Sequence, residues 1–295
     1  MRVLTRPDLD GLTCAVLLKV VEAVDAVIFV EPHPFQTGQI EVRDTDIVAN
    51  LPYHPGCGKW FDHHASNALP PDTPFVGAFH VDPSAARTIF NHYQDPRLER
   101  YRELLEATDK VDSAQLSLED VLNPEGYVLL SLTLDPRSNI DTEGGKYFYD
   151  LLAWLATDDL ATLLSRPAVA WRTQKLLAEQ EAFRACLQKH SFQDGNVVIT
   201  DFRALHPQPV GNRFLVYALF PTCDTSIKAY PAHKNPGHVG LSIGHSIFLK
   251  TQTVSAGALC ARFGGGGHVG AGSCVVKAEV ADEILQHMRQ ALRRA

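Results

Sequence analysis

The sequence predicts an α/β fold, and three observations predict it. Short β-branched or apolar runs alternate with helical patterns in the first half of the chain. Acidic residues and histidines recur at the ends of those runs. A long helical pattern then separates this half from a second, smaller group of expected strands. Alternation of this kind indicates a parallel sheet with helices on both of its faces.

The elements of the first half follow from apolar spacing and from end signals. The segment 12–24 has helical spacing, and the RPDLDG stretch before it is typical of a turn. A helix is expected to begin at Ser84, which is a good N-cap residue. Residues 97–113 carry a helix that is expected to end near Thr108. Strands are expected at 3–5, 26–30, 46–51 and 59–64.

The second half is organised around one long helix. Residues 168–190 form a single helical pattern rich in Ala, Leu, Gln and Glu, and the turn signal QDGN follows it. Strands are expected at 196–202 and 213–220. We therefore predict a first domain over 1–167, a connecting helix over 168–190 and a second domain over 191–295.

The composition of the chain limits the kinds of molecule that it is expected to bind. The chain has 295 residues, of which 45% are hydrophobic, as in ordinary soluble proteins. Its net charge of −7 argues against sequence-independent binding of long nucleic acid, but it is compatible with a small anionic substrate bound in a local pocket. The six cysteines form no CxxC pair, and no signal peptide or membrane span is visible. We expect a cytoplasmic protein whose oligomeric state is open, a homodimer being one alternative.

Two polar spots follow the first and third expected strands. Asp8 and Asp10 lie in the DLDG stretch between a strand and a helix, where parallel sheets bind ligands, and both carboxylates are expected to reach one ion. The alternative is a plain Asp-Gly turn in which an aspartate caps the helix. Asn50 closes the DIVAN run, and its alternative is a turn residue ahead of a proline.

Two further spots carry the residue types of a metal site. Asp62, His63 and His64 combine carboxylate and imidazole, which suits Mn, Fe, Co or Zn better than Mg or Ca. The alternative is a pair of surface histidines after a strand. Asp109 and Asp112 lie in DKVDS, where the alternative is a solvated helix end whose lysine favours the helix dipole.

A fifth spot, RFGGGGHVGAGSC at 262–274, is rich in glycine. Four consecutive glycines stabilise neither a helix nor a strand, but they let a backbone approach a ligand and aim its N–H groups at an anion. His268 adds a donor. The alternative is a flexible loop, although the segment runs directly into the apolar residues CVV.

Taken together, these stretches resemble the DHH–DHHA1 phosphoesterase superfamily. That group includes exopolyphosphatases, nano-RNases, cyclic-dinucleotide phosphodiesterases and the single-strand nuclease RecJ. DLDG, NLP, DHH, DKVD and GGGGH stand in the family's motif order over almost the whole chain. The resemblance implies a DHH domain with a parallel five-stranded sheet flanked by helices, a linker helix and a smaller α/β DHHA1 domain with a mixed sheet.

The resemblance also implies roles for individual residues. His64 would face the substrate's phosphate as a catalytic residue. Ser84, at a helix N-terminus, would help to hold a phosphate; Arg137 is a further candidate, with a structural salt bridge as its alternative. The metal ligands would be Asp8, Asp10, Asn50, His63 and either Asp109 or Asp112, and the glycine segment would bind substrate through Gly265, Gly266, Gly267 and His268.

Two departures from the family pattern bear on the metals. The family usually has a histidine just before the first aspartate pair, where this chain has Thr5 or Arg6. Motif II usually offers an aspartate that bridges two metals, and Asn50 is a neutral ligand. We therefore expect one tight Mn²⁺ site and a second that is weak or absent. The Arg6 guanidinium is expected to supply catalytic positive charge beside Asp8.

The function expected from these observations is hydrolysis. The chain is expected to be a metal-dependent phosphoesterase that uses metal-activated water on a small phosphorylated substrate. Short oligonucleotides, dinucleotides and polyphosphate all remain open as substrates. The alternative is a regulatory protein on the same fold, catalytically weakened by Arg6 and Asn50, that binds a nucleotide or phosphate without hydrolysing it.

Overall fold

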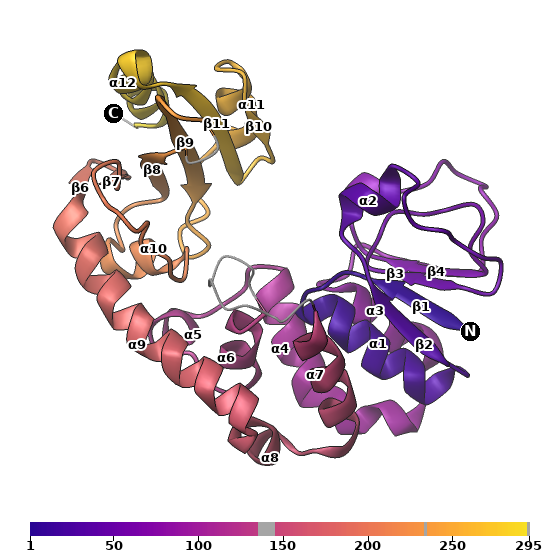
Figure 1. Ribbon diagram of the computed structural model, residues 1–295. Coiled ribbons are helices and arrows are strands. Elements are labelled where there is room, and N and C mark those ends of the chain that lie inside the picture. Colours follow the sequence, from indigo (N-terminus) through magenta and orange to yellow (C-terminus); the bar gives the residue numbers. More distant parts are fainter. Residues whose placement is uncertain (135–144, 233–234, 294–295) are drawn as a thin grey trace. The chain divides into compact units, whose positions relative to one another are not determined.

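The computed structural model describes residues 1–134, 145–232 and 235–293. The chain divides into two compact units (Figure 1). The first comprises Met1–Leu116 and Pro124–Gln174, and the second comprises Ser117–Asn123 and Lys175–Ala295. The division falls inside helix α9 (Pro167–His190), the segment expected to connect the two domains.

A five-stranded, fully parallel sheet forms the centre of the first unit. Its strand order is β2-β1-β3-β4-β5. The parallel sheet that the sequence predicts is therefore confirmed, and all four expected strands are present, the first one residue longer and the other three shorter than expected. The strands are β1 (Arg2–Thr5), β2 (Ala26–Phe29), β3 (Ile47–Ala49), β4 (Lys59–Asp62) and β5 (Gly77–Phe79).

The two faces of this sheet are covered differently. Val3 of β1 packs into a large apolar core together with helices of the first unit, whereas the next residue, Leu4, points to the opposite face. That second face is covered by the short α2 and by aromatic residues from loops, with Trp60 at its centre. Long helices therefore cover only one face, because the segments 37–46 and 50–58 on either side of β3 are loops.

Helices and short 3₁₀ segments make up most of the rest of the first unit. They are α1 (Leu9–Val21), α2 (Pro32–Gln36), the 3₁₀ turn η1 (Ala65–Asn67), α3 (Ala85–Tyr93), the 3₁₀ helix η2 (Pro96–Tyr101), α4 (Arg102–Asp112), α6 (Gly126–Leu132), α7 (Lys146–Thr157) and α8 (Leu160–Ser165).

Two helix ends differ from the expectation in ways that matter for the site. Helix α1 begins at Leu9 with Asp8 as its N-cap, so Asp10 lies in the first helical turn and not in an extended turn. Helix α4 does not end near Thr108 but continues to Asp112. Buried Leu104, Leu105 and Thr108 anchor its inner face, so the helix continues through the polar DKVD stretch.

The second unit is built on a six-stranded mixed sheet, as the resemblance implied. Its strand order is β10-β11-β9-β8-β7-β6, and only β7 and β8 pair in parallel. Helices α11 (Ala256–Ala261) and α12 (Ala281–Leu292) cover one face of the sheet and enclose a second apolar core. The strands are β6 (Ser191–Asp194), β7 (Val197–Asp201), β8 (Thr225–Pro231), β9 (His238–His245), β10 (Gly266–Gly267) and β11 (Ala271–Lys277).

One expected strand of this unit is wrong. The apolar run 213–220 contains helix α10 (Leu215–Leu219), which packs near α5 (Leu118–Leu122). Short apolar runs that are buried on several sides do not distinguish a helix from a strand. The remaining helical elements are α11 (Ala256–Ala261), the 3₁₀ turn η4 (Ala278–Val280) and α12 (Ala281–Leu292).

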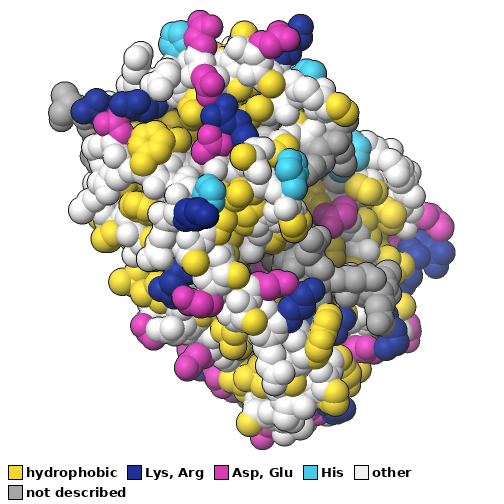
Figure 2. Space-filling view, turned by 60° about the vertical axis from the view of Figure 1, so that its left-hand side comes forward, with side chains coloured by type: hydrophobic (Ala, Val, Ile, Leu, Met, Phe, Trp, Pro, Cys, Tyr) yellow, Lys and Arg dark blue, Asp and Glu magenta, His cyan; other side chains and the backbone are white. Residues whose placement is uncertain are grey.

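The surface agrees with the charge balance of the sequence. On the face that Figure 2 shows, acidic and basic side chains are interspersed, with no continuous basic stripe among the described residues. Within the described part of the chain, none of the helices combines the length and the apolar character needed to cross a bilayer.

Candidate metal centre

The candidate site lies where strands of the parallel sheet end. Asp8 follows β1, Asn50 follows β3, and the Asp62-His63-His64 triplet closes β4. The carboxyl ends of parallel strands share one edge of the sheet, which is where such folds place their ligands. The end of α4 adds Asp112 to this edge, 3.2 Å from His63.

Asp8 is held by three groups of its own chain. Its Oδ1 atom accepts hydrogen bonds from the Gly11 N–H at 2.8 Å and from the Asn50 side-chain amide at 3.0 Å. Its Oδ2 atom lies 3.2 Å from Nε of Arg6. The carboxylate therefore faces a cation and an amide that this chain supplies itself.

Asp10 is almost completely buried, and the start of α3 holds it in place. Its two oxygens accept hydrogen bonds from the main-chain N–H groups of Ala85 at 2.9 Å and Ala86 at 2.8 Å. Burial and the charges of Asp112 and Asp8 raise the pKa of Asp10 well above its ordinary value, although these two hydrogen bonds act against that shift. A nearby cation would reverse the effect.

The glycine of the DLDG stretch is required by close packing. A Cβ atom at Gly11 would lie 2.1 Å from the main-chain oxygen of Arg6. No side chain fits there without moving the loop. Gly11 therefore lets the first turn of α1 pack directly against the preceding loop and brings Asp8 and Asp10 to the same edge.

His63 points toward two of the carboxylates. Its Nδ1 atom lies 3.0 Å from the main-chain oxygen of Asp82, and its Nε2 atom lies 3.2 Å from Asp112 and 3.7 Å from Asp10. Burial raises the pKa of Asp112, and the neighbouring imidazole of His63 partly offsets this. The ligand atoms of Asp10, His63 and Asp112 all lie within 4.8 Å of one another.

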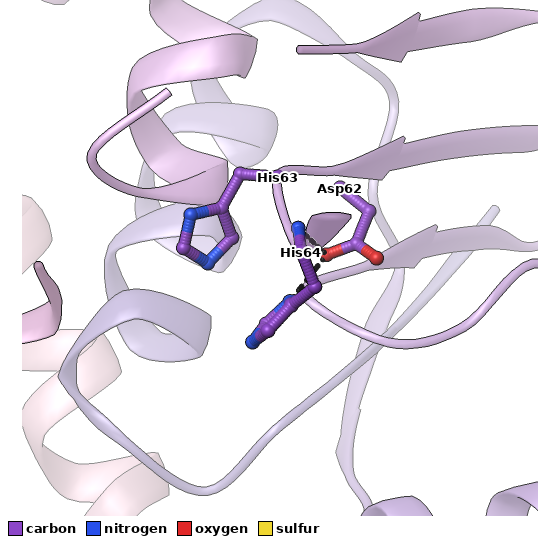
Figure 3. A group of neighbouring side chains, drawn as sticks. All are labelled: Asp62, His63 and His64. Carbon is purple, nitrogen blue, oxygen red and sulfur yellow. Dashed lines mark hydrogen bonds and ion pairs between the residues drawn. The ribbon is translucent and has the colours of Figure 1, made fainter. Parts of the chain in front are cut away.

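Asp62, His63 and His64 form a second group whose ligand atoms all lie within 4.8 Å of one another (Figure 3). The Nδ1 atom of His64 lies 2.7 Å from Oδ1 of Asp62, and the side-chain amide of Asn67 donates to Oδ2 at 2.6 Å. The hydrogen bond to Asp62 raises the pKa of His64. Asp62 therefore orients the His64 ring.

Asp109, the other acid of the fourth motif, has a different environment. It accepts a hydrogen bond from the Ser84 hydroxyl at 2.6 Å and pairs with the Arg87 guanidinium, whose Nε lies 2.8 Å away. Ser84 in turn accepts from the Arg87 N–H as the N-cap of α3. Ser84 is fully buried and both its roles are internal to this ion-pair network. Arg137 lies outside the described residues.

The glycine segment packs tightly against its own unit. A Cβ atom at Gly265 would lie 2.0 Å from the Ser273 main-chain oxygen, and one at Gly267 would lie 2.3 Å from that of Ala271. Nothing lies within 4 Å of a Cβ at Gly266. His268 is exposed beside them. Close approach to β11 therefore accounts for two of the glycines, and Gly266 and His268 remain accessible.

The donor set fits a divalent cation. Two buried polar atoms of the motif residues, Asn50 Oδ1 and His63 Nε2, have no hydrogen-bond partner among the described residues. Unpaired buried acceptors are costly, and a cation satisfies them. One imidazole nitrogen with two carboxylates suits Mn²⁺, Fe²⁺ or Zn²⁺.

Comparison with known proteins was made by sequence and by structure. A scan against family models and a search of curated proteins find no match. Among solved structures, the pGpG-specific phosphodiesterase PggH from Vibrio cholerae is similar over 99% of this chain and 98% of its own, with 31% identity and a TM-score of 0.90. The chain belongs to the DHH–DHHA1 phosphoesterase superfamily.

More distant structures share the DHH–DHHA1 fold. RecJ from Thermus thermophilus, solved with Mn²⁺, is 16% identical with a TM-score of 0.56, over 99% of this chain and 51% of RecJ. An exonuclease RecJ bound to manganese is also 16% identical with a TM-score of 0.54, over 100% and 90% of the two chains. The family and fold that the motifs predicted are confirmed.

Sequence reasoning missed the residues that support the motif residues. Arg87 fixes Asp109, the Asp82 carbonyl lies against His63, and Asn67 holds Asp62. Arg87 carries one signal in the sequence, since it lies three residues after the N-cap Ser84 on a helix that packs against α4. The contact between His63 and the Asp82 main-chain oxygen leaves no such signal, because every residue has a main-chain oxygen.

Proposed function

We propose that this protein is a metal-dependent phosphodiesterase that cleaves a short linear dinucleotide, with pGpG as the first substrate to test. The similarity to PggH over nearly the full length of both chains supports this choice. Cleavage would add water across the internal phosphodiester of pGpG and release two molecules of guanosine monophosphate. A net charge of −7 suits a short substrate better than a long polymer.

One relationship carries the proposal. The Nδ1 atom of His63 faces a main-chain oxygen, which only accepts hydrogen bonds, so Nδ1 carries the proton. In the neutral form of the ring, the Nε2 lone pair would then face the Asp112 carboxylate at 3.2 Å. Two lone pairs at that distance repel unless a cation or a proton lies between them. Asp10 at 3.7 Å adds a second carboxylate, which favours a divalent metal.

The roles of the chain's own residues follow from this arrangement. His63, Asp10 and Asp112 would hold the cation, which when bound would supply Lewis acidity and an activated water at neutral pH. The Nδ1–H group of His64 donates to Asp62, which raises the pKa of His64, so the protonated ring would donate its outward-facing Nε2–H group to a phosphoryl oxygen. The half-buried Gly266 and the exposed His268 would bind the other part of the substrate.

We propose one tight Mn²⁺ and no equally tight second ion. Asp8 already faces a cation of its own chain, because Arg6 Nε lies 3.2 Å from Oδ2, and the Asn50 amide donates to Oδ1. The guanidinium is a permanent cation, so it offsets the charge of Asp8 where a second metal would otherwise do so. Arg6 would also favour the phosphate of the substrate.

The contacts of Asp8 with Arg6 and Asn50 support a second candidate function. Arg6 offsets the charge of Asp8, and the Asn50 amide hydrogen-bonds to it. A protein with this arrangement would bind a dinucleotide but hydrolyse it weakly, and would act as a regulatory binding protein. This candidate predicts tight binding of the dinucleotide without turnover.

A single assay separates the two. The metal-free protein is incubated with bis-p-nitrophenyl phosphate or with pGpG, with and without Mn²⁺, and products are followed by absorbance and chromatography. Release of p-nitrophenol and guanosine monophosphate only with Mn²⁺, lowered by about 10²–10³-fold in His64→Ala, supports the enzyme. Binding of pGpG without product would overturn it in favour of the regulatory protein.

A further inference from the structure

Both oxygens of the buried Asp62 carboxylate are engaged, and Asn67 engages one of them. Oδ1 lies 2.7 Å from Nδ1 of His64 (Figure 3). Oδ2 accepts a hydrogen bond from the Asn67 side-chain amide at 2.6 Å. Asp62 itself is fully buried. A buried carboxylate keeps one orientation only if both of its oxygens find donors.

The turn after β4 is what brings Asn67 to this position. The main-chain N–H of Asn67 donates to the His64 oxygen at 2.8 Å and closes the 3₁₀ turn η1. The turn folds the chain back on itself, so the Asn67 amide meets the acid five residues earlier. Ser66 in the same turn is exposed.

We propose that Asn67 is a positioning residue that acts through Asp62 on His64. By holding Oδ2, Asn67 prevents rotation of the carboxylate and keeps Oδ1 on Nδ1 of His64. The proton of the neutral imidazole then stays on Nδ1, and Nε2, for which the described residues offer no hydrogen bond, keeps its direction. The inference rests on the proposed function insofar as His64 contacts the substrate's phosphate.

A purely structural role for Asn67 makes a different prediction. The hydrogen bond that closes the turn is made by its main chain and persists in any variant other than proline. Loss of the side-chain amide would then lower the melting temperature at most. Only a positioning role changes the state of the His64 ring.

The deciding measurement is the ¹⁵N spectrum of the His64 side chain in the metal-free protein, at a pH where that ring is neutral. The parent and the control Ser66→Ala are expected to show the Nδ1-protonated tautomer. Asn67→Ala and Asn67→Leu, which both remove the donor, are expected to show averaging between tautomers. The leucine variant keeps the size of the side chain and carries the test if the alanine variant does not fold. An unchanged Nδ1 signal in a folded variant would overturn the inference.

A second arm measures turnover of pGpG with Mn²⁺. Asn67→Ala is expected to lower kcat by about 10-fold, with Mn²⁺ affinity unchanged and with Ser66→Ala equal to the parent. A kcat equal to that of the parent would contradict the positioning role. If the parent itself turns over no pGpG, the proposed function fails, and the ¹⁵N spectra still decide the inference.

Discussion

Asp109 and Asp112 lie three residues apart in the last turn of α4, yet their carboxylates have different partners. Asp112 lies 3.2 Å from Nε2 of His63, whereas Asp109 is held by Ser84 and by the Arg87 guanidinium. The sequence left open which of the two ligates a metal. This geometry favours Asp112 as the ligand. Asp109 instead links α4 to α3 through Ser84 and Arg87.

The pair Asp112→Asn and Asp109→Asn tests that division of roles. Asp112→Asn removes one carboxylate from the cation site, so Mn²⁺-dependent hydrolysis of pGpG is expected to be lost while the fold remains. Asp109→Asn removes a hydrogen-bonded ion pair and is expected to lower the free energy of unfolding by about 1.5–3 kcal/mol while metal affinity is kept. Activity assays and chemical denaturation of both variants provide the check. The reverse pattern would assign the ligand to Asp109.

The number of bound ions should depend on Arg6 and Asn50. We expect calorimetry and metal analysis to find one tight Mn²⁺ per parent chain, because both oxygens of Asp8 are engaged by these two side chains. In the double variant Arg6→His with Asn50→Asp, an imidazole and a carboxylate replace a cation and an amide, so a second Mn²⁺ is expected. Two equally tight ions in the parent would be incompatible with this account.

Two adjacent glycines of the second unit should respond differently to a methyl group. In Gly265→Ala the new Cβ would meet the Ser273 oxygen at 2.0 Å, so we expect a loss of about 1–3 kcal/mol in the free energy of unfolding. Gly266→Ala meets nothing within 4 Å and should melt like the parent. A raised KM for pGpG in Gly266→Ala alone would indicate a contact with the substrate. Equal melting temperatures would refute the packing argument.

Acid stability should depend on Asp46, which is buried at the start of β3. Burial opposes its ionisation, but hydrogen bonds from Arg2 and from the Arg43 main chain outweigh this and lower the pKa of Asp46. A lowered pKa in the folded state gives stability that is present above the unfolded value of about 4 and is lost as pH falls through the folded value. Melting temperatures between about pH 5 and pH 3 should therefore fall less steeply in Asp46→Asn than in the parent. Parallel slopes would show that Asp46 contributes no such linkage.

Much of the site could be predicted because its residues follow strands. A parallel sheet brings the residues after β1, β3 and β4 to one edge, so the order of DLDG, Asn50 and the Asp62-His63-His64 triplet was informative. The choice between Asp109 and Asp112 was not predictable, because it depends on Arg87 of another helix. Helix α10 was missed because a short buried apolar run fits either type of element.

The central claim is that His63, Asp10 and Asp112 together bind a divalent cation. Calorimetric titration of Mn²⁺ into the metal-free parent and into His63→Ala tests this claim without any assumption about the substrate. We predict tight binding of one Mn²⁺ to the parent and its loss in His63→Ala, with both proteins folded. Equal Mn²⁺ affinity in the two proteins would contradict the account.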